Sequence, residues 1–462
     1  MPSTLDAADS PRKTAKLLID HFRCPEDLAD FTVAGGLSHD SGYFRLGPDV
    51  ICYGQCSSCT PAESPKESLH DAREHASVDG PSVRLSFDPV QIVDNLRCER
   101  YYTSAQGKGV PTANNFVKNM YYLARPYFPV ALRRLLQRLY FRGWDKMSFP
   151  TWPVDRTVED IFEQLLVLSM KAQNVEKVPF IWFWPDQALS CTILTHDVET
   201  SAGLDFCPQL LDLTDSFGIK SSFQFVPEKR YRVPGSLLEA IRRRGFEINV
   251  HDLNHDGHLF SARDQFLRRV ERINHYARQF NALGFRSAVM YRNTDWYDAF
   301  DFSYDMSIPN VAHLDPQQGG CCTVLPYFIG KILELPVTTT QDYTLFHIFN
   351  DYSIRLWKEQ ISLIRQKHGL ISFIIHPDYV IDETPRRVYS ELLKYLCQLR
   401  TRGETWIALP KEVANWWRLR SEMNLVKAQG SWSIEGKGSD RARLAYAVLT
   451  NNKISYEFAA GS

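Results

Sequence analysis

The sequence of 462 residues predicts an α/β protein whose larger part is a parallel β/α domain, either an incomplete barrel or a doubly wound sheet. Two observations predict it. After about residue 188, short β-branched and apolar runs alternate with stretches of helical apolar spacing. This alternation continues over roughly 220 residues, which is enough for several β/α units. In such folds the functional side chains lie at the carboxyl ends of the strands.

The predicted strands are short apolar runs, several of which end in a polar residue. In chain order they are SCTILTHD (190–197), SSFQFV (221–226), FEINVH (246–251), FRSAVM (285–290), ILELPV (332–337), ISFIIH (371–376) and TWIAL (405–409). Helical spacing predicts helices over 208–217, 235–244, 264–281, 352–367 and 386–400, and a last one in LPKEVANWWRLRSEM.

Residues 1–187 are predicted to form an N-terminal accessory α+β region, and residues 188–423 the β/α domain. Residues 424–462 alternate like strands around Gly and Asn-Asn turns, which predicts a short C-terminal β-hairpin extension. Within the first region, segment 56–81 is rich in Ser, Pro and charged residues, which is typical of a long mobile loop or the tip of a hairpin.

Segment 116–144 combines helical apolar spacing with six basic residues and two prolines, so it contains two helices at most. A basic amphipathic helix can associate with an anionic membrane surface, which would suit an enzyme acting on lipid-linked sugars. A domain helix with a solvated basic face is the more common origin of this pattern.

The net charge excludes one large class of partner. Lys and Arg total 53 against 54 acidic residues, so no overall field favours nucleic acid. The chain has no signal-peptide h-region and no run of eighteen apolar residues, so we expect a cytoplasmic protein. Ten scattered cysteines are expected to be reduced thiols. The oligomeric state is not predicted.

The run TILTHDVET brings two carboxylates to the end of a predicted strand. In an extended chain, positions i and i+2 share a face, so Asp197 and Glu199 would point into one cavity while Val198 points into the core. The alternative is that Asp197 or Glu199 only caps the following helix.

The stretch HDLNHDGH follows the strand FEINV and contains three histidines. His251 and His255 are four residues apart, which on a helical turn would align both imidazoles for Zn²⁺ or another divalent ion. Asp197 or Glu199 would be the third ligand, and the remaining position would bind water. Alone, such a pair is more often two surface or core histidines, and His258 lies outside the spacing.

Four more polar side chains lie at or near strand ends. Arg286 lies in GFRSA, with Arg292 six residues further on, and Asp342 follows ELPVTTTQ. The apolar run FII ends at His376, which suits a general acid tuned by a neighbouring carboxylate.

The order of these motifs resembles the NodB-homology polysaccharide deacetylases, carbohydrate esterase family 4, over roughly residues 190 to 420. The family pattern T-F-D-D-G, H-[ST]-x-x-H, an arginine motif, an aspartate segment and L-x-x-H has counterparts here in the same order. They are THDVE (195–199), HDLNH (251–255), GFRSA (284–288), LPVTTTQD (335–342) and FIIH (373–376).

The resemblance implies a distorted (β/α)₇ barrel of NodB type that removes N-acetyl groups from a polysaccharide or a lipid-linked sugar. It also implies a divalent metal, with Zn²⁺ expected first and Co²⁺ or another transition metal as the alternative. Asp197 matches the general base, His251 and His255 the metal ligands, Arg286 the residue that orients the base, and His376 the catalytic acid. Asp342 falls in the segment whose aspartate supports that histidine, although this local match is loose.

One position departs from the family pattern. The second aspartate of the family, a metal ligand, aligns with Val198, which cannot bind a metal. Glu199 is the natural replacement because the i, i+2 geometry brings it beside Asp197. If Glu199 does not reach the metal, either Asp197 is the acidic ligand or the site works without metal.

Three other hypotheses fit parts of the sequence. The spacing of Cys52, Cys56 and Cys59 matches that of radical-SAM iron-sulfur sites, but no glycine-rich partner follows. A non-catalytic carbohydrate-binding protein would use the tryptophans Trp182, Trp184 and Trp296, although such aromatics are more often core. The same fold could also hydrolyse O-acetyl esters or other C–N amide bonds, and the sequence does not separate these.

Overall fold

The computed structural model describes residues 10–28, 31–80, 82–102, 141 and 143–459. The chain divides into two compact units. The first contains residues 1–105, 156–187 and 416–462, and the second contains residues 106–155 and 188–415. The residues after 416 thus group with the N-terminal segments, whereas the sequence predicts a separate extension from residue 424. The basic segment 116–144 lies almost entirely outside the described residues.

The second unit is built on a nine-stranded sheet. Its strands are β7 (Cys191–Val198), β8 (Ser222–Phe225), β9 (Glu247–His251), β10 (Gly284–Arg286), β11 (Tyr304–Asp305), β12 (Tyr327–Ile329), β13 (Ile332–Glu334), β14 (Leu370–Ile375) and β15 (Trp406–Ile407). The order is β12-β13-β11-β10-β9-β8-β7-β14, with β15 also paired to β7, and only the β12–β13 pair is antiparallel. From β7 to β13 the strand order follows the chain without the reversal of a doubly wound sheet, so the sheet is wound like a barrel.

Side chains rather than a backbone ladder connect the two ends of this curved sheet. The hydroxyl of Thr338, just after β13, donates to the Leu370 carbonyl of β14 at 2.7 Å, and that of Thr339 donates to the Ser372 carbonyl at 2.7 Å. The Ser372 N–H in turn donates to Thr338 Oγ1 at 3.0 Å. The threonine run after β13 therefore supplies hydrogen bonds that an additional strand would have made.

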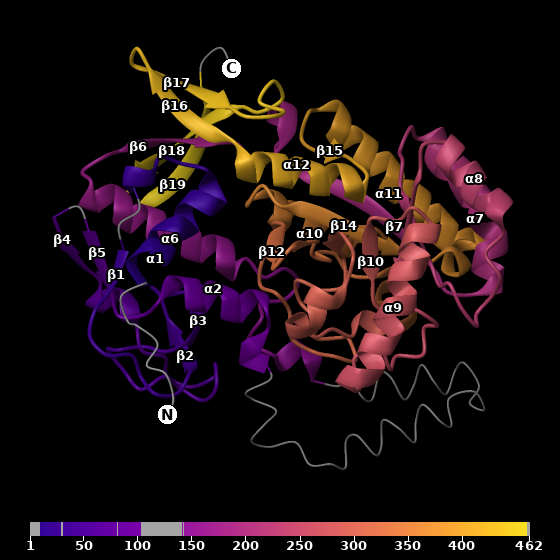
Figure 1. Ribbon diagram of the computed structural model, residues 1–462, viewed down its shortest axis with the longest axis horizontal. Helices are drawn as coiled ribbons and strands as arrows, with labels where there is room; N and C mark the ends of the chain where they lie inside the picture. The colour runs from indigo at the N-terminus through magenta and orange to yellow at the C-terminus, as the bar shows by residue number, and fades with distance from the viewer. Residues whose placement is uncertain (1–9, 29–30, 81, 103–140, 142, 460–462) are drawn as a thin grey trace. The chain divides into compact units, whose positions relative to one another are not determined.

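Helices α7 (Ser201–Ser216), α8 (Gly235–Arg243), α9 (Arg263–Gln279), α10 (Arg355–Arg365) and α11 (Glu383–Thr401) lie around these strands (Figure 1). Four of the predicted helices agree with these bounds to within about three residues. The helix predicted from 208 begins seven residues earlier, because Thr200 caps it by accepting from the Gly203 N–H at 3.0 Å. The connections from β10 to β11 and from β11 to β13 contain no α-helix, so strand and helix do not alternate strictly.

The strand predicted over 285–290 is mostly wrong. β10 ends at Arg286, and residues Ala288–Met290 form a 3₁₀ turn. Val289 has a φ of 57°, a conformation that a β-branched residue rarely adopts. The chain therefore turns sharply directly after Arg286.

A large apolar core lies between the sheet and its helices. Phe223 and Phe225 of β8 contribute to it together with Leu392 of α11, and Val198 at the end of β7 is completely buried there. The strand ends are thereby held by close-packed surroundings, so polar side chains at those ends have restricted positions.

The first unit is a separate α+β structure. Its helices are α1 (Ser10–Phe22), α2 (Pro89–Arg97) and α6 (Thr157–Ala172), and α12 (Pro410–Glu422) crosses the boundary between the units. Its strands are β1 (Phe31–Val33), β2 (Gly42–Arg45), β3 (Ile51–Gly54), β4 (Ser77–Asp79), β5 (Ser82–Leu85), β6 (Lys177–Ile181), β16 (Asn424–Ala428), β17 (Ser431–Glu435), β18 (Leu444–Thr450) and β19 (Lys453–Phe458). The C-terminal strand β18 pairs with β6, which explains why the last residues belong to this unit.

Segment 56–81 contains local structure. A 3₁₀ helix spans Ala72–His75, β4 pairs with β5, and isolated bridges join Tyr43 to Ala62 and Arg45 to Asp71. Its mobility stays a prediction. Across the described parts of the chain, no helix is both long and apolar enough to span a bilayer.

Candidate active site

Asp197 lies at the end of β7, where Arg286 of β10 holds it. The Arg286 Nη1 donates to Asp197 Oδ1 at 2.7 Å and to Thr195 Oγ1 at 2.7 Å, and its Nε donates to the Met306 carbonyl at 2.9 Å. Both Arg286 and Asp197 are buried. Burial raises the pKa of Asp197, but the guanidinium and the nearby histidines outweigh it and lower the pKa overall. The Asp197 carboxylate is therefore kept ionised, with Oδ2 left to face the site.

Glu199 lies next to Asp197, while the intervening residue is in the core. Asp197 Oδ2 is 3.9 Å and Glu199 Oε1 3.5 Å from the same atom, His251 Nε2. Val198 is fully buried between them. The i, i+2 geometry expected from the sequence thus brings both carboxylates to one imidazole.

His251 ends β9, and His255 follows in an irregular loop. The predicted helical turn is wrong, because residues 252–258 contain bends and no helix, and both Asp252 and His255 have a φ of 55°. These two left-handed residues turn the chain back, so the imidazole centroids are still only 4.8 Å apart. The Nδ1 of His251 donates to the Arg286 carbonyl at 3.1 Å, which leaves the lone pair of its Nε2 facing the site.

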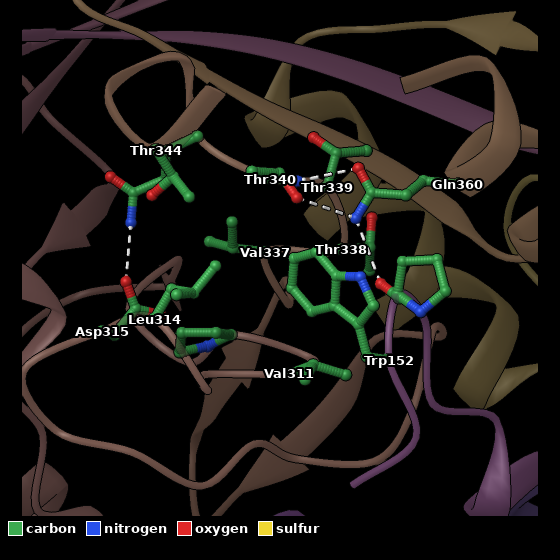
Figure 2. Close-up of a pocket in the computed structure, with 13 residues that line it drawn as sticks. Trp152, Val311, Leu314, Asp315, Val337, Thr338, Thr339, Thr340, Thr344 and Gln360 are labelled. Atoms are coloured by element: carbon green, nitrogen blue, oxygen red, sulfur yellow. Dashed lines mark hydrogen bonds between the residues drawn. The ribbon is translucent and has the colours of Figure 1, made fainter. Parts of the chain in front are cut away.

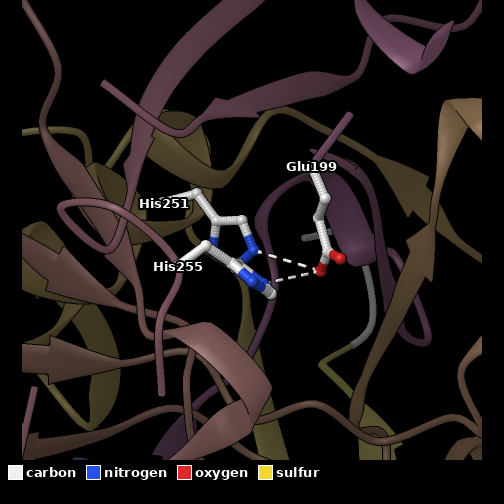
Figure 3. Close-up of side chains that lie close together, drawn as sticks. All are labelled: Glu199, His251 and His255. Atoms are coloured by element: carbon white, nitrogen blue, oxygen red, sulfur yellow. Dashed lines mark hydrogen bonds and ion pairs between the residues drawn. The ribbon is translucent and has the colours of Figure 1, made fainter. Parts of the chain in front are cut away.

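Glu199, His251 and His255 converge on one point (Figure 3). Their ligand atoms lie within 4.8 Å of one another, and no other group of this kind occurs among the described residues. Glu199 Oε1 is 2.9 Å from His255 Nε2 and 3.5 Å from His251 Nε2. Tetrahedral ligands at about 2.1 Å from Zn²⁺ lie about 3.4 Å apart, so these separations fit a shared divalent ion. The buried Nε2 of His255 lacks a well-aligned hydrogen bond, which also fits a metal ligand.

Arg230, in the loop after β8, contacts the second histidine. Its Nη2 donates to the His255 carbonyl at 2.7 Å and approaches His255 Nδ1 at 3.1 Å. A carbonyl or carboxylate is the usual partner of the outer nitrogen of a metal-binding histidine. Here a cation lies in that position, so this side of the site differs from a usual metal centre.

His376 follows β14 and is held by Asp342. Its Nδ1 donates to Asp342 Oδ1 at 2.7 Å, and its backbone N–H donates to Asp342 Oδ2 at 2.7 Å. The Nε2 faces Glu199 Oε1 at 3.3 Å. Burial lowers the pKa of His376, but the carboxylates of Asp342 and Glu199 outweigh it and raise the pKa well above its usual value. Asp342, whose segment matches the aspartate segment of the family pattern only loosely, is therefore in direct contact with His376.

The tertiary structure also brings in residues that the sequence did not single out. The ring of Tyr379 packs on His376 with centroids 4.8 Å apart. The hydroxyl of Tyr231 donates to the Val198 carbonyl and accepts from the Val226 N–H at 3.0 Å. In the sequence, Tyr379 lies three residues after His376 in HPDYV, and Arg230 lies in the basic run EKRYR. These are the signals from which the two residues could have been chosen as site candidates.

Several other candidates lie elsewhere. His258 is exposed, and Arg292 donates to the Met290 carbonyl at 2.7 Å instead of entering the site. Trp182 and Trp184 are buried in the first unit, and Trp296 packs on Phe266. Among the described residues, Cys52, Cys56 and Cys59 do not form a cluster of metal-ligand atoms.

No model of a known protein family matches the sequence, and no curated protein does. Solved structures match over about half of the chain. A protein from Mycobacterium smegmatis assigned as a polysaccharide deacetylase is 19% identical, with a TM-score of 0.43, over 54% of this chain and 96% of its own. The Puue allantoinase is 13% identical, with a TM-score of 0.40, over 51% of this chain and 92% of its own.

A third match is a family 4 acetyl xylan esterase from Clostridium thermocellum, in complex with a cobalt ion. It is 16% identical, with a TM-score of 0.30, over 49% of this chain and 91% of its own. Polysaccharide deacetylases, the family that the motifs resemble, thus recur among the matching structures.

A separate pocket lies in the second unit (Figure 2). Trp152, Asp315 and the run Thr338–Gln341 line it, and none of the predicted site residues does. Its polar groups bond mainly to each other: Gln341 Nε2 donates to Asp315 Oδ1 at 3.2 Å, and Gln360 bonds Thr340 and the Pro153 carbonyl. These internal bonds leave few groups to recognise a ligand.

Proposed function

We propose that this chain is a metal-dependent hydrolase that removes the acetyl group from an N-acetylated carbohydrate, giving acetate and a free amine. One observation carries the proposal. Glu199 Oε1 lies between 2.9 and 3.5 Å from the Nε2 atoms of His251, His255 and His376. Beside this cluster is the buried Asp197–Arg286 pair. A proton acceptor, a proton donor and a set of metal ligands thus meet at neighbouring strand ends.

Glu199, His251 and His255 would hold the metal, because two imidazoles and one carboxylate are a donor set that suits Zn²⁺, with Co²⁺ as the alternative. When bound, a divalent ion polarises a carbonyl and makes water more acidic. Glu199 would then be the acidic metal ligand, because Val198, which aligns with the metal-binding aspartate of the family, cannot bind a metal.

Asp197 would take the proton from the attacking water. Its Oδ1 is engaged by Arg286, whose other bonds to Thr195 and Met306 fix the guanidinium. The free Oδ2 faces His251, on the side of the proposed metal. Arg286 is thus proposed as the residue that positions this base.

His376 would give a proton to the leaving nitrogen. An amine is a poor leaving group until it is protonated, so amide hydrolysis needs such an acid. Asp342 holds Nδ1 and the backbone N–H of His376, which aims Nε2 at the cluster. This fixed acid favours the amide over the O-acetyl ester as the bond that is cleaved.

A non-catalytic carbohydrate-binding protein is the second class of function. The lost family aspartate and the tryptophans Trp182, Trp184 and Trp296 are the features that motivate it. Glu199 lies where an acidic ligand is needed, and two of those tryptophans are buried, which leaves this alternative with little support.

The test combines metal analysis with acetate release from N-acetylated oligosaccharides. We expect about one divalent ion per chain and metal-dependent acetate release, both lost in Glu199→Gln, with metal affinity lowered at least 100-fold. Asp256→Asn is the matched control, because this carboxylate lies beside His255 in the loop but pairs with Arg269. Wild-type activity in Glu199→Gln, or no metal and no acetate in the wild type, would refute the proposal.

A further inference from the structure

The loop between β8 and α8 contains three exposed cations in four residues, Lys229, Arg230 and Arg232. None of them has a carboxylate within ion-pair distance in the described part of the chain. This loop follows the carboxyl end of β8, so it belongs to the same end of the sheet as the candidate active site.

The acidic residues nearby already have other partners. Glu228 pairs with Arg272 of α9 at 2.5 Å, and Asp256 pairs with Arg269 through two contacts of 2.7 Å. Glu199 lies among the site histidines. The positive charge of the loop is therefore not balanced by its neighbours.

Arg230 is anchored rather than free to swing away. Its Nη2 bonds to the His255 carbonyl at 2.7 Å and approaches Nδ1 of the same residue at 3.1 Å. Its Nε and Nη1 have no hydrogen-bond partner among the described residues, and the side chain is exposed. One imidazole ring separates this guanidinium from Glu199 Oε1.

A fixed cation against a metal-binding histidine weakens metal binding by repulsion unless an anion compensates it. Asp197, Glu199 and Asp342 already lie against Arg286 and the site histidines. The charge of Lys229, Arg230 and Arg232 then remains in excess, so the loop favours a ligand with negative charge.

We propose that the substrate carries an anionic oxygen group, a carboxylate or a phosphate, which Arg230 binds together with Lys229 and Arg232. The anionic group lies on the acetylated sugar or on the residue next to it, since only the His255 ring separates Arg230 from the cluster. This inference rests on the proposed function, because it names the class of carbohydrate that this site accepts.

The experiment compares three substrates for acetate release and, by calorimetry, for binding. They are an N-acetylhexosamine 1-phosphate, an N-acetylated hexosaminuronate and a neutral N-acetylhexosamine oligomer. We expect kcat/KM and affinity to be at least about tenfold higher for one or both anionic sugars. The difference between the phosphate and the carboxylate identifies which group the loop prefers.

The double variant Lys229→Gln/Arg232→Gln should lose most of this preference and keep its activity on the neutral oligomer. It removes charge without changing the contact to His255. Arg230→Gln should lose the preference as well, and it should also change metal affinity because it removes the contact to His255. Arg243→Gln is the control, because it removes one exposed charge at the far end of α8, about 12 Å along the helix from the loop.

Equal kcat/KM and equal affinity for the three sugars, or no detectable binding of either anionic sugar, would overturn the inference. An equal loss in Arg243→Gln would also overturn it, since the effect would then reflect net charge. Acetate release without an anionic preference leaves the proposed function intact. Preferential binding of an anionic sugar without any acetate release would instead refute the proposed function.

Discussion

Replacing Asp342 by asparagine should disable His376 without removing any group that touches the substrate. Asp342 is fully buried, and its two oxygens accept three hydrogen bonds, each at 2.7 Å, from His376 Nδ1, the His376 N–H and the Tyr343 N–H. Asparagine has one acceptor oxygen and one donor nitrogen, so at least one of these donors would face another donor.

Two magnitudes follow from this geometry. A hydrogen bond to a charged group is worth about 1.5–3 kcal/mol, so loss of the charged contact to Nδ1 should lower kcat roughly 10- to 100-fold. One buried donor without a partner should lower the free energy of unfolding by about 1–3 kcal/mol. KM and metal content should stay close to those of the wild type, because Asp342 contacts neither substrate nor the proposed metal ligands.

Steady-state acetate release, metal analysis and urea unfolding test these expectations together. Asp315→Asn is the matched control, because Asp315 accepts from Gln341 Nε2, next to Asp342 in the chain, but lines the separate pocket. A folded, metal-loaded Asp342→Asn protein with kcat within twofold of the wild type would show that His376 does not depend on this carboxylate.

Three further predictions concern single side chains. Val198→Asp, which restores the family pattern, should lower the free energy of unfolding by more than about 3 kcal/mol and leave metal affinity unchanged, because Val198 is in the apolar core; tighter metal binding in a calorimetric titration would contradict this. His376→Ala should reduce acetate release from an N-acetyl sugar at least about tenfold more than from an aryl acetate, because a phenolate leaves without protonation; equal losses on both substrates would argue against His376 as the acid. Burial lowers the pKa of His313 to about 4, so the unfolded chain takes up a proton there that the folded chain does not. The free energy of unfolding should therefore fall by up to about 3 kcal/mol as the pH falls from about 6.5 to 4, and His313→Asn should flatten this part of the pH profile; an unchanged profile would show that another group is responsible.

Much of the candidate site could be predicted from the sequence, because polar residues at strand ends are local signals. Asp197, His251 and His376 each end an apolar run, and parallel strands bring their carboxyl ends to one edge. The alternation of side chains along an extended chain predicted that Asp197 and Glu199 share one face while Val198 points into the core, and the structure has this arrangement. The assumed helical turn between the histidines failed, because positive φ values at Asp252 and His255 are not visible in a spacing.

The sequence by itself determined the alternation of strand and helix and the residue types that could do chemistry, since both depend on neighbours close in the chain. Only the tertiary structure decided that the strands follow one another as in a barrel, and that Thr338 and Thr339 bond to β14. It also decided that Arg230 lies against His255, and Asp342 against His376. These contacts join residues 25 to 34 positions apart, so they depend on how the packed elements bring distant segments together, which a local pattern does not encode.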